Sequence, residues 1–345
     1  MLHAPLEVED QTGSVGLVAA IADYAASYAI DGDSAIQTAR HCLIDALAQG
    51  LEVLRDPSRA LLIGPLVPGA LMPGGARVPG TSLELDPAQA AFCTSLMLCR
   101  PVNGSPWLSS LSGSAGDSFG AILATADFQA RKATMEGTAP LKVRDMLAGL
   151  VKGLEIQGLL APEVANASPT IGETGIRAAR VAASAVATAQ MGGTPAKIIT
   201  AVSHACIEGS MFLDAAERLV IGRADLARAE SAGRAVRYAC QAMATGRPSY
   251  LTPDDVRAVD LAGTFISAHP SALNKAFRTG VIDRLSRDRT AQQAAEVATR
   301  FRATVERYFP ARQAERIEAL FAAPGRLDDL PVNELLAALV TNGAR

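Results

Sequence analysis

Two short blocks of sequence, Gly80-Thr-Ser-Leu-Glu-Leu-Asp-Pro-Ala-Gln-Ala-Ala-Phe92 and Ala121-Ile-Leu-Ala-Thr-Ala-Asp127, decide the fold. Asp86-Pro87 begins a helix, because aspartate caps a first helical turn and proline is pre-set for the first helical position. We expect this helix to end near Cys99 and the next helix to begin close to Ser118. The pattern from 80 to 127 is therefore helix, loop, helix.

The pattern on both sides of these blocks is also helical. The clearest amphipathic element is Lys142 to Leu160, whose apolar residues recur at helical spacing: Val143, Met146, Leu147, Leu150, Val151 and Leu154. Further helices are predicted over 15–28, 33–54 (capped by Asp33 or Ser34), 174–191, 195–209, 224–245, 290–308, 311–322 and 331–341, with a short one opened by Thr252-Pro253. Prolines and glycines between 57 and 80 predict a long ordered loop with at most short extended pieces. Alternating strand patterns are scarce, so the predicted fold class is all-α.

The composition supports this fold class and argues against nucleic acid or a membrane as the partner. Of the 345 residues, 49% are apolar and only 4% aromatic. An alanine-rich chain of this kind packs as close helices more readily than as sheets. The net charge of −3 and the dispersed basic residues give no field that would recruit nucleic acid or an anionic membrane. No nucleic-acid or membrane partner is therefore predicted.

The cysteine pattern and the amino-terminal sequence together predict the cellular compartment of the protein. Five cysteines lack Cys-x-x-Cys spacing and are expected to be free thiols that pack as small hydrophobes: Cys42, Cys93, Cys99, Cys206 and Cys240. The acidic first ten residues do not form a signal peptide, and no apolar run reaches membrane-spanning length. The sequence therefore predicts a cytoplasmic protein.

Several further blocks, in order along the chain, resemble the MmgE/PrpD family, as do the two opening blocks. They are Ile21–Tyr24, Ala39–Asp45, Gly75–Thr81, Gly153–Gly158, Gly233–Arg237, Phe309–Gln313 and Leu330–Glu334. That family includes 2-methylcitrate dehydratases, cis-aconitate decarboxylase and iminodisuccinate epimerase. The resemblance implies the family's helical domain and a lyase ancestry.

The resemblance also implies a domain organisation. Such proteins join a large helical domain to a smaller α/β lid domain inserted late in the chain. Here the residues between the two helical parts have a helical pattern, so we expect the lid domain to be missing. The prediction is one helical domain over 1–345: a family part at 1–260, a helical linker replacing the lid at 261–309, and C-terminal helices returning to the core at 310–345.

The loop between the opening blocks should carry the chemistry: Leu98-Cys-Arg-Pro-Val-Asn-Gly-Ser-Pro-Trp-Leu-Ser-Ser-Leu-Ser-Gly-Ser-Ala-Gly-Asp-Ser-Phe-Gly120. Removing a proton beside a carboxylate requires a positioned base and a positioned acid. Aligning Trp107 with the family's tryptophan puts two acidic positions, an asparagine, two histidines and a lysine on residues that lack those groups. The two acidic positions fall on Val102 and Ser105, and the asparagine falls on Gly104. The two histidines fall on Ser114 and Gly175, and the lysine falls on Ala224, beside Arg223.

No other residues replace these groups in an evident way. The histidines are expected to be terminal, structural or in the linker, and no pair of them has metal-ligand spacing: His3, His41, His204 and His269. Gly113–Gly120 precedes a helix and could cradle an anion, but it lacks the lysine of a phosphate-binding loop. No metal or cofactor is therefore predicted, while a small carboxylate ligand is.

Three functions fit these observations. The first is a non-catalytic, regulatory or scaffold descendant that has lost acid–base dehydration. The alternative is a repurposed lyase or isomerase that acts on a small carboxylate-containing substrate in specialised metabolism. Its candidate site residues are Asn103, Ser105, Ser114, Asp117 and Arg223, and Arg100, Glu173 or Glu217 would assist them. The second alternative is a working 2-methylcitrate dehydratase-like lyase.

The sequence also predicts a homodimer. The helix over 174–191 has little polar surface, so it needs cover on more than one side. We expect this alanine-rich helix to form a two-fold interface larger than roughly 2,000 Å² of total buried area.

Overall fold

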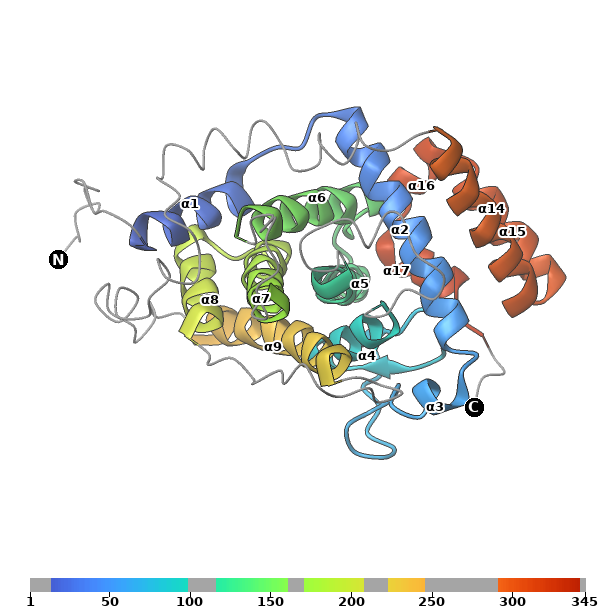
Figure 1. Ribbon diagram of the computed structural model, residues 1–345, viewed down its shortest axis with the longest axis horizontal. Coiled ribbons are helices and arrows are strands. Elements are labelled where there is room, and N and C mark those ends of the chain that lie inside the picture. Colours follow the sequence, from blue (N-terminus) through green and yellow to red (C-terminus); the bar gives the residue numbers. More distant parts are fainter. Residues whose placement is uncertain (1–13, 99–115, 161–170, 208–222, 246–290, 342–345) are drawn as a thin grey trace.

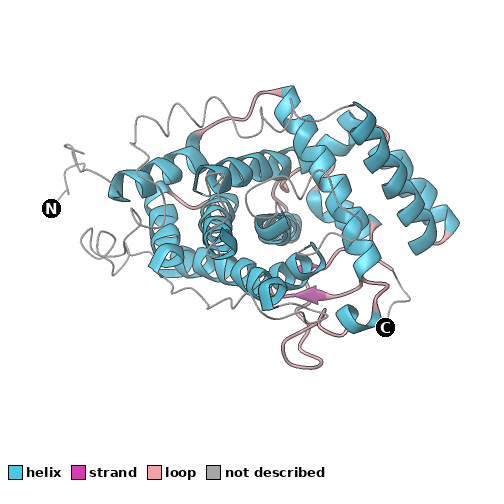
Figure 2. Cartoon of the chain, in the orientation of Figure 1, coloured by secondary structure: helices cyan, strands magenta, loops and turns pink. Residues whose placement is uncertain are grey.

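The computed structural model describes residues 14–98, 116–160, 171–207, 223–245 and 291–341. Over these ranges the fold is all-α, as predicted (Figures 1 and 2). The helices are α1 (Ser14–Ser27), α2 (Asp33–Val53), α3 (Pro57–Ala60), α4 (Pro87–Leu98), α5 (Gly116–Glu136), α6 (Val143–Leu160), α7 (Ile171–Gln190), α8 (Pro195–Ile207), α9 (Arg223–Thr245), α14 (Ala291–Tyr308), α15 (Ala311–Phe321), α16 (Pro324–Asp329) and α17 (Val332–Ala338). The strands β1 (Ala76–Arg77) and β2 (Glu84–Leu85) form a small antiparallel pair.

Local sequence signals account for most of the helix ends. The Asp86 carboxylate accepts hydrogen bonds of 3.1 Å from the backbone N–H groups of Ala88 and Gln89, so the predicted cap of α4 is confirmed. The predicted cap of α2 is wrong, because Gly32 occupies the cap position and makes no side-chain bond. Helices α3 and α16 were not predicted. The helix expected at Thr252-Pro253 and the linker up to residue 290 lie outside the described residues.

Helix α7 lies inside the bundle, where α5, α6, α8 and α9 pack around it (Figure 1). Its apolar side chains are covered by the same chain: Val181 and Ala182 are 1% and 0% exposed, and Ala185 and Val186 are 0% and 2%. The prediction that this helix forms a two-fold interface is therefore wrong. Alanines at its surface let neighbouring helices approach closely and fill the space a partner would have used.

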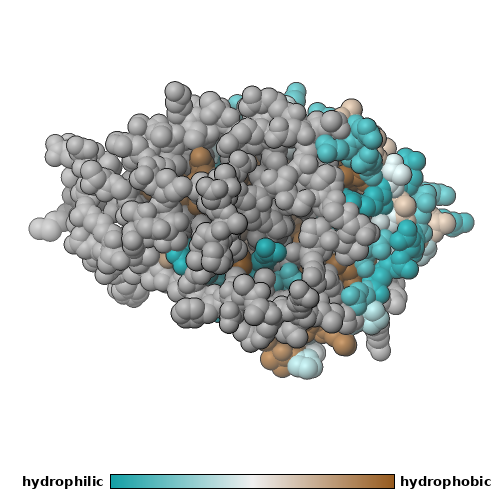
Figure 3. All heavy atoms as spheres, viewed as in Figure 1, coloured by the Kyte–Doolittle hydropathy of each residue, from teal (hydrophilic) through white to brown (hydrophobic). Residues whose placement is uncertain are grey.

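The C-terminal helices pack on the N-terminal half of the chain. The backbone N–H of Val143 donates to Leu330 O at 2.8 Å, and that of Val332 donates to Leu141 O at 2.9 Å. Helix α14 packs along α2, and α17 packs on α5 and α6. The outer side of α14 and α15 is hydrophilic (Figure 3). How the chain as a whole divides into the predicted parts stays a prediction.

A single backbone carbonyl holds two of the C-terminal segments. Gly80 O accepts a hydrogen bond of 3.0 Å from the Tyr308 hydroxyl and one of 2.8 Å from the Thr341 hydroxyl. Gly80 has φ of 78°, and a Cβ there would lie 2.7 Å from Leu51 Cδ2. Both the backbone angle and the space require glycine at this position.

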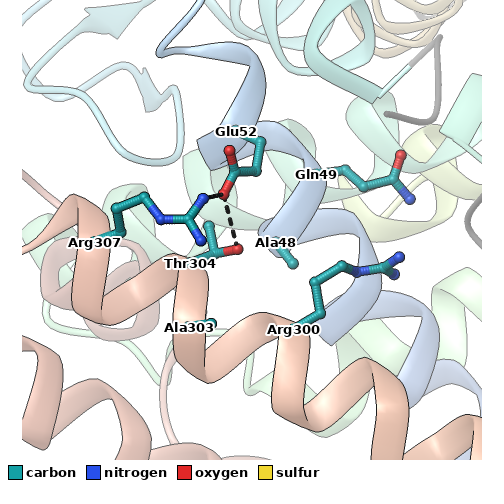
Figure 4. A pocket seen from close by; sticks show the side chains of 7 residues that line it. All are labelled: Ala48, Gln49, Glu52, Arg300, Ala303, Thr304 and Arg307. Carbon is teal, nitrogen blue, oxygen red and sulfur yellow. Dashed lines mark hydrogen bonds and ion pairs between the residues drawn. The ribbon is translucent and has the colours of Figure 1, made fainter. Parts of the chain in front are cut away.

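Two ion pairs of different exposure join α2 to α14, and Figure 4 shows the one that contains Glu52. Asp45 is 0% exposed and pairs with Arg300, and Gln49 Nε2 lies 3.5 Å from the same carboxylate. About two turns further on, Glu52 accepts hydrogen bonds from Arg307 at 2.8 Å and from the Thr304 hydroxyl at 3.2 Å. A pocket of about 150 Å³ separates the two groups, because only alanines, Ala48 and Ala303, lie between them.

These two pairs should differ strongly in their effect on stability. Asp45→Ala should lower the free energy of unfolding by about 3–5 kcal/mol, because it leaves Arg300 facing a buried, unpaired site. Arg307→Ala is the matched control, since its side chain is 51% exposed. It should cost less than about 1 kcal/mol. Denaturant unfolding measures both values, and equal losses in the two variants would contradict this assignment.

Candidate functional site

Close contact between helices α4 and α5 fixes the point at which the candidate site begins. A Cβ on Gly120 would overlap the Ser95 hydroxyl and would lie 3.0 Å from Ala91 O. The start of α5 is therefore pressed against the last turns of α4. The predicted loop 99–115 connects these two helix ends but lies outside the described residues.

The start of α5 also lies beside the end of α6. Ser118 and Gln157 are 0% and 1% exposed, and the Ser118 hydroxyl donates to Gln157 Oε1 at 3.2 Å. A Cβ on Gly153 would lie 2.7 Å from Ile122 Cδ1, so this glycine allows the two helices to approach. A buried hydroxyl and a buried amide thus occupy this junction.

Helix α7 begins in the same region, between α8 and α9. The Ser231 hydroxyl of α9 donates to Ile176 O at 3.3 Å, and Arg180 Nε donates to Ala205 O in the last turn of α8 at 3.1 Å. Gly175 lies in this first part of α7 and is buried. The start of α7 is therefore enclosed by the end of α8 and the first turns of α9.

Helix α9 runs antiparallel to α4. A Cβ on Gly233 would lie 3.0 Å from Ala88 O and 3.5 Å from Phe92 Cβ. Further along α9, the negative charge of Asp86, at the start of α4, is near enough to contribute to the raised pKa of the Cys240 thiol, after the effect of burial. The start of α9 is consequently directed toward the end of α4. We call the region where α5, α7 and α9 begin and α4, α6 and α8 end the "site end" of the bundle.

The structure brings together the helix starts that carry four of the predicted site positions. Asp117 is the second residue of α5, Gly175 is the fifth of α7, and Arg223 and Ala224 open α9. The side chains of Asp117, Arg223 and Ala224 are not among those the structure describes. The other predicted positions lie outside the described residues: Val102, Asn103, Gly104, Ser105 and Ser114, with Arg100 and Glu217.

The helix starts at the site end carry partial positive charge, and Asp225 adds a buried carboxyl in the first turn of α9. Each helix start presents backbone N–H groups without intrahelical partners and the positive end of a helix dipole. Arg180 adds a guanidinium that is 6% exposed, and its burial lowers its pKa while the group remains cationic. Arg177 lies one turn earlier on α7 and is half-buried.

Sequence reasoning missed Arg180 as a site residue. Its signal was present, because Arg177 and Arg180 are the two charged residues in the otherwise uncharged run from 174 to 196. Two charges one helical turn apart in an alanine-rich helix face the same side. Their meaning becomes clear only when the carbonyl of Ala205, far along the chain, is seen to meet Arg180.

The described histidines have packing roles. Burial, and after it the charge of Arg40, lowers the pKa of His41. His204 lies edge-on to Tyr238 at 5.9 Å between ring centres, and burial lowers its pKa as well. Both imidazoles are therefore neutral at pH 7. His3 and His269 lie outside the described residues.

A second polar cluster lies where β1, β2 and α5 meet α17. Asp127 is 0% exposed and accepts a hydrogen bond of 2.7 Å from the backbone N–H of Arg77. Arg131 pairs with Glu84 at 2.6 Å, and the Arg77 guanidinium donates to Asn333 O at 3.0 Å. Burial raises the pKa of Asp127 to about 7, against the opposing effect of both guanidinium groups. Four of the sequence blocks meet here, so their polar residues hold the fold together.

The described residues contain neither a metal-binding cluster nor a helix that could cross a membrane. No three side chains of the histidine, cysteine, aspartate or glutamate type lie close enough together there to hold a metal ion. Cys42, Cys93, Cys206 and Cys240 are free thiols, and Cys99 lies outside these residues. None of the described helices has the length and apolar character needed to cross a membrane.

The architecture is that of a helical domain with a polar end built from helix starts. The chain belongs to the MmgE/PrpD family, since residues 19–254 match the model of the MmgE/PrpD N-terminal domain. This match covers the helices that form the site end and the part of the Asp127 cluster on β1, β2 and α5.

Curated relatives carry the same name across distant organisms. The 2-methylcitrate dehydratase of Salmonella typhi is 40% identical over 235 residues, which are 67% of this chain and 48% of that protein. The 2-methylcitrate dehydratase of Cupriavidus necator shows the same identity and coverage. The mitochondrial 2-methylcitrate dehydratase of Yarrowia lipolytica is 38% identical over 191 residues, 55% of this chain and 36% of its own. The chain spans about half the length of the bacterial relatives it matches.

Asp127 should make stability depend on pH. Its pKa is raised from 3.8 to about 7 in the folded protein, so in that interval the folded state binds a proton that the unfolded state has lost. The free energy of unfolding should therefore fall as pH rises through this interval, by at most about 1.4 kcal/mol per pH unit. In Asp127→Asn this contribution should vanish. Denaturant unfolding at several pH values measures it, with the exposed Asp329→Asn as control, and an unchanged slope in Asp127→Asn would exclude Asp127 as the source.

Proposed function

We propose that this chain is a non-catalytic MmgE/PrpD-family protein that has lost acid–base dehydration and binds a small carboxylate in a regulatory or scaffold role. Gly175 carries the proposal. It lies buried in the first part of α7, at the position where the resemblance expects a histidine. Glycine has no side chain to give or take a proton, so the base or acid of this position is gone.

The other assigned positions support the same conclusion. Ser105, Ser114 and Ala224 stand where the resemblance expects an acid, a histidine and a lysine. A serine hydroxyl exchanges protons only with an adjacent base to activate it, and alanine does not exchange them at all. Asp117 is the acidic residue that remains in the loop and at the start of α5, and a single carboxyl cannot serve both faces of an elimination.

What remains at the site end favours binding. The helix starts and the guanidinium of Arg180 supply positive charge in a region where Ser118 and Gln157 are already buried and hydrogen-bonded. Such groups hold a carboxylate in place without transferring a proton.

The first alternative, a repurposed enzyme, would use the same cationic groups. A repurposed lyase or isomerase would need the cationic region to fix its substrate, and the burial of Arg180 would strengthen that contact. It would also need an acid or base from the candidates Asn103, Ser105, Ser114, Asp117 and Arg223. The second alternative, a working dehydratase, draws on the names of the relatives at 40% identity.

Dehydration of 2-methylcitrate should be undetectable in the purified protein. Each missing acid or base typically contributes about 10²–10⁴-fold to a rate, although losses within one site are not additive. The measurement is the ultraviolet absorbance of the new carbon–carbon double bond, with the Salmonella typhi relative as positive control. Turnover that Asp117→Asn abolishes would overturn the proposal in favour of an enzyme.

Binding should survive the loss of catalysis. A tricarboxylate such as citrate should raise the melting temperature of the protein, and ten times its dissociation constant would add about 1.4 kcal/mol to the free energy of unfolding. Arg177→Gln should weaken this effect, whereas Lys132→Gln, on the exposed end of α5, should leave it unchanged. No shift with any di- or tricarboxylate would contradict the binding role.

A further inference from the structure

A small pocket lies between α2 and α14, and polar groups stand at both of its ends (Figure 4). Two alanines separate an end with an arginine and a glutamine from an end with a glutamate, a threonine and an arginine: Ala48 and Ala303, Arg300 and Gln49, and Glu52, Thr304 and Arg307. Its volume is about 150 Å³. A cavity of about this size holds a molecule as large as benzene, so the pocket fits a ligand of about half a dozen non-hydrogen atoms. We call it the α2–α14 pocket.

The arginines of this pocket can bind a further acceptor. Arg300 reaches Asp45 through Nη2, and Arg307 donates to Glu52 Oε1 through Nη1 at 2.8 Å. A guanidinium carries five N–H groups, so each arginine keeps donors for a ligand. Arg300 Nε is a buried donor that has no partner among the described residues. Arginine donors pair best with the oxygens of a carboxylate or a phosphate.

The ion pairs around the pocket leave one positive charge in excess. Over the described part of the chain, the guanidinium groups of Arg55, Arg300 and Arg307 pair with two carboxylates, those of Asp45 and Glu52. The wall that α2 contributes is largely buried, so salt screens this charge less than it would at an open surface. A ligand with one negative charge is therefore favoured.

The acceptors in the pocket determine the second group of the ligand. Glu52 would repel a second negative charge, whereas it accepts a hydrogen bond of 3.2 Å from the Thr304 hydroxyl. Gln49 Oε1, at the other end, is buried without a hydrogen-bond partner within the described ranges. A hydroxyl on the ligand would match these acceptors, because it donates a hydrogen bond and carries no charge.

We propose that the α2–α14 pocket binds a small oxyanion that carries one negative charge and a hydroxyl group. The charged oxygens accept hydrogen bonds from Arg300 and Arg307, and the hydroxyl donates to Glu52. Two sources share this chemistry, namely a 2-hydroxy monocarboxylate such as lactate and dihydrogen phosphate. The site goes beyond the proposed function, because the tricarboxylate expected at the site end is too large and too highly charged for it.

Isothermal titration calorimetry with lactate and with phosphate, at matched ionic strength, tests the proposal. A mildly acidic buffer keeps phosphate mainly in its singly charged form. At least one of the two anions should bind, and Arg307→Gln should weaken this binding by at least about 10-fold, because a hydrogen bond between charged groups is lost. Arg302→Gln is the matched control, since Arg302 also lies on α14 but pairs with Glu318 at 3.5 Å, and it should bind as the unaltered protein does.

A second variant tests the space rather than the charge. Ala303→Leu keeps every charged group and fills the middle of the pocket, so it should abolish binding. Ala303 is exposed and leucine favours a helix, so circular dichroism should show that the fold is retained. Binding of lactate alone would identify a carboxylate as the ligand, and binding of phosphate alone would identify a phosphate.

Three results would overturn the proposal. A lack of binding by both anions would exclude this class of ligand. Undiminished binding in both Arg307→Gln and Ala303→Leu would place the anion elsewhere. Binding that is lost in Arg177→Gln would assign the anion to the site end, so this proposal and the proposed function can fail independently.

Discussion

The absence of side chains at a few helix crossings determines the arrangement of the bundle. Gly120 lets α5 touch the backbone of α4, Gly153 lets α6 approach α5, and Gly233 lets α9 cross α4. A Cβ at Gly120 would overlap the backbone nitrogen of Ser95 at 2.6 Å, and one at Gly233 would press on Ala88 O at 3.0 Å. A Cβ at Gly153 would displace only the end of the Ile122 side chain. The low aromatic content follows from this constraint, since large rings do not fit between helices packed so closely. Every other feature, including the site end, depends on these short distances.

The groups that hold the fold and the groups that would do chemistry are separate in this chain. The hydrogen bonds that join β1, α5 and α17 lie away from the site end. They are made by Asp127, Arg77 and Asn333, and all three residues are present in this chain. Of the positions with assigned acid–base roles, Gly175 and Ala224 lie at the site end among the described residues, and neither carries a group that exchanges a proton. A chain can lose the second set without losing the first, because the two sets share no contact among the described residues. Under the proposed function, this separation allows acid–base groups to be lost while the identity to dehydratases remains at 40%.

Much of the fold could be predicted from the sequence, and the reasons for the failures are physical. Helical periodicity located α6, and the aspartate–proline pair located the start of α4, because both signals are local. The cover of α7 could not be predicted, since an alanine-rich face looks the same whether its own helices or a second copy bury it. The positive region at Arg180 depends on a carbonyl that is distant in sequence. The loop over 61–72 was predicted as a loop, but its exposure depends on what packs nearby, which sequence does not state.

The double hydrogen bond at Gly80 O has a consequence for synthesis on the ribosome. The carbonyl belongs to the first quarter of the chain, and both of its donors, Tyr308 and Thr341, belong to the last. The N-terminal helices must therefore wait for nearly the whole chain to emerge before this turn and α2 gain their native cover. During that interval α2 exposes Asp45 and its apolar neighbours. The protein should consequently depend on chaperone protection during translation more than a bundle stabilised by neighbouring helices alone.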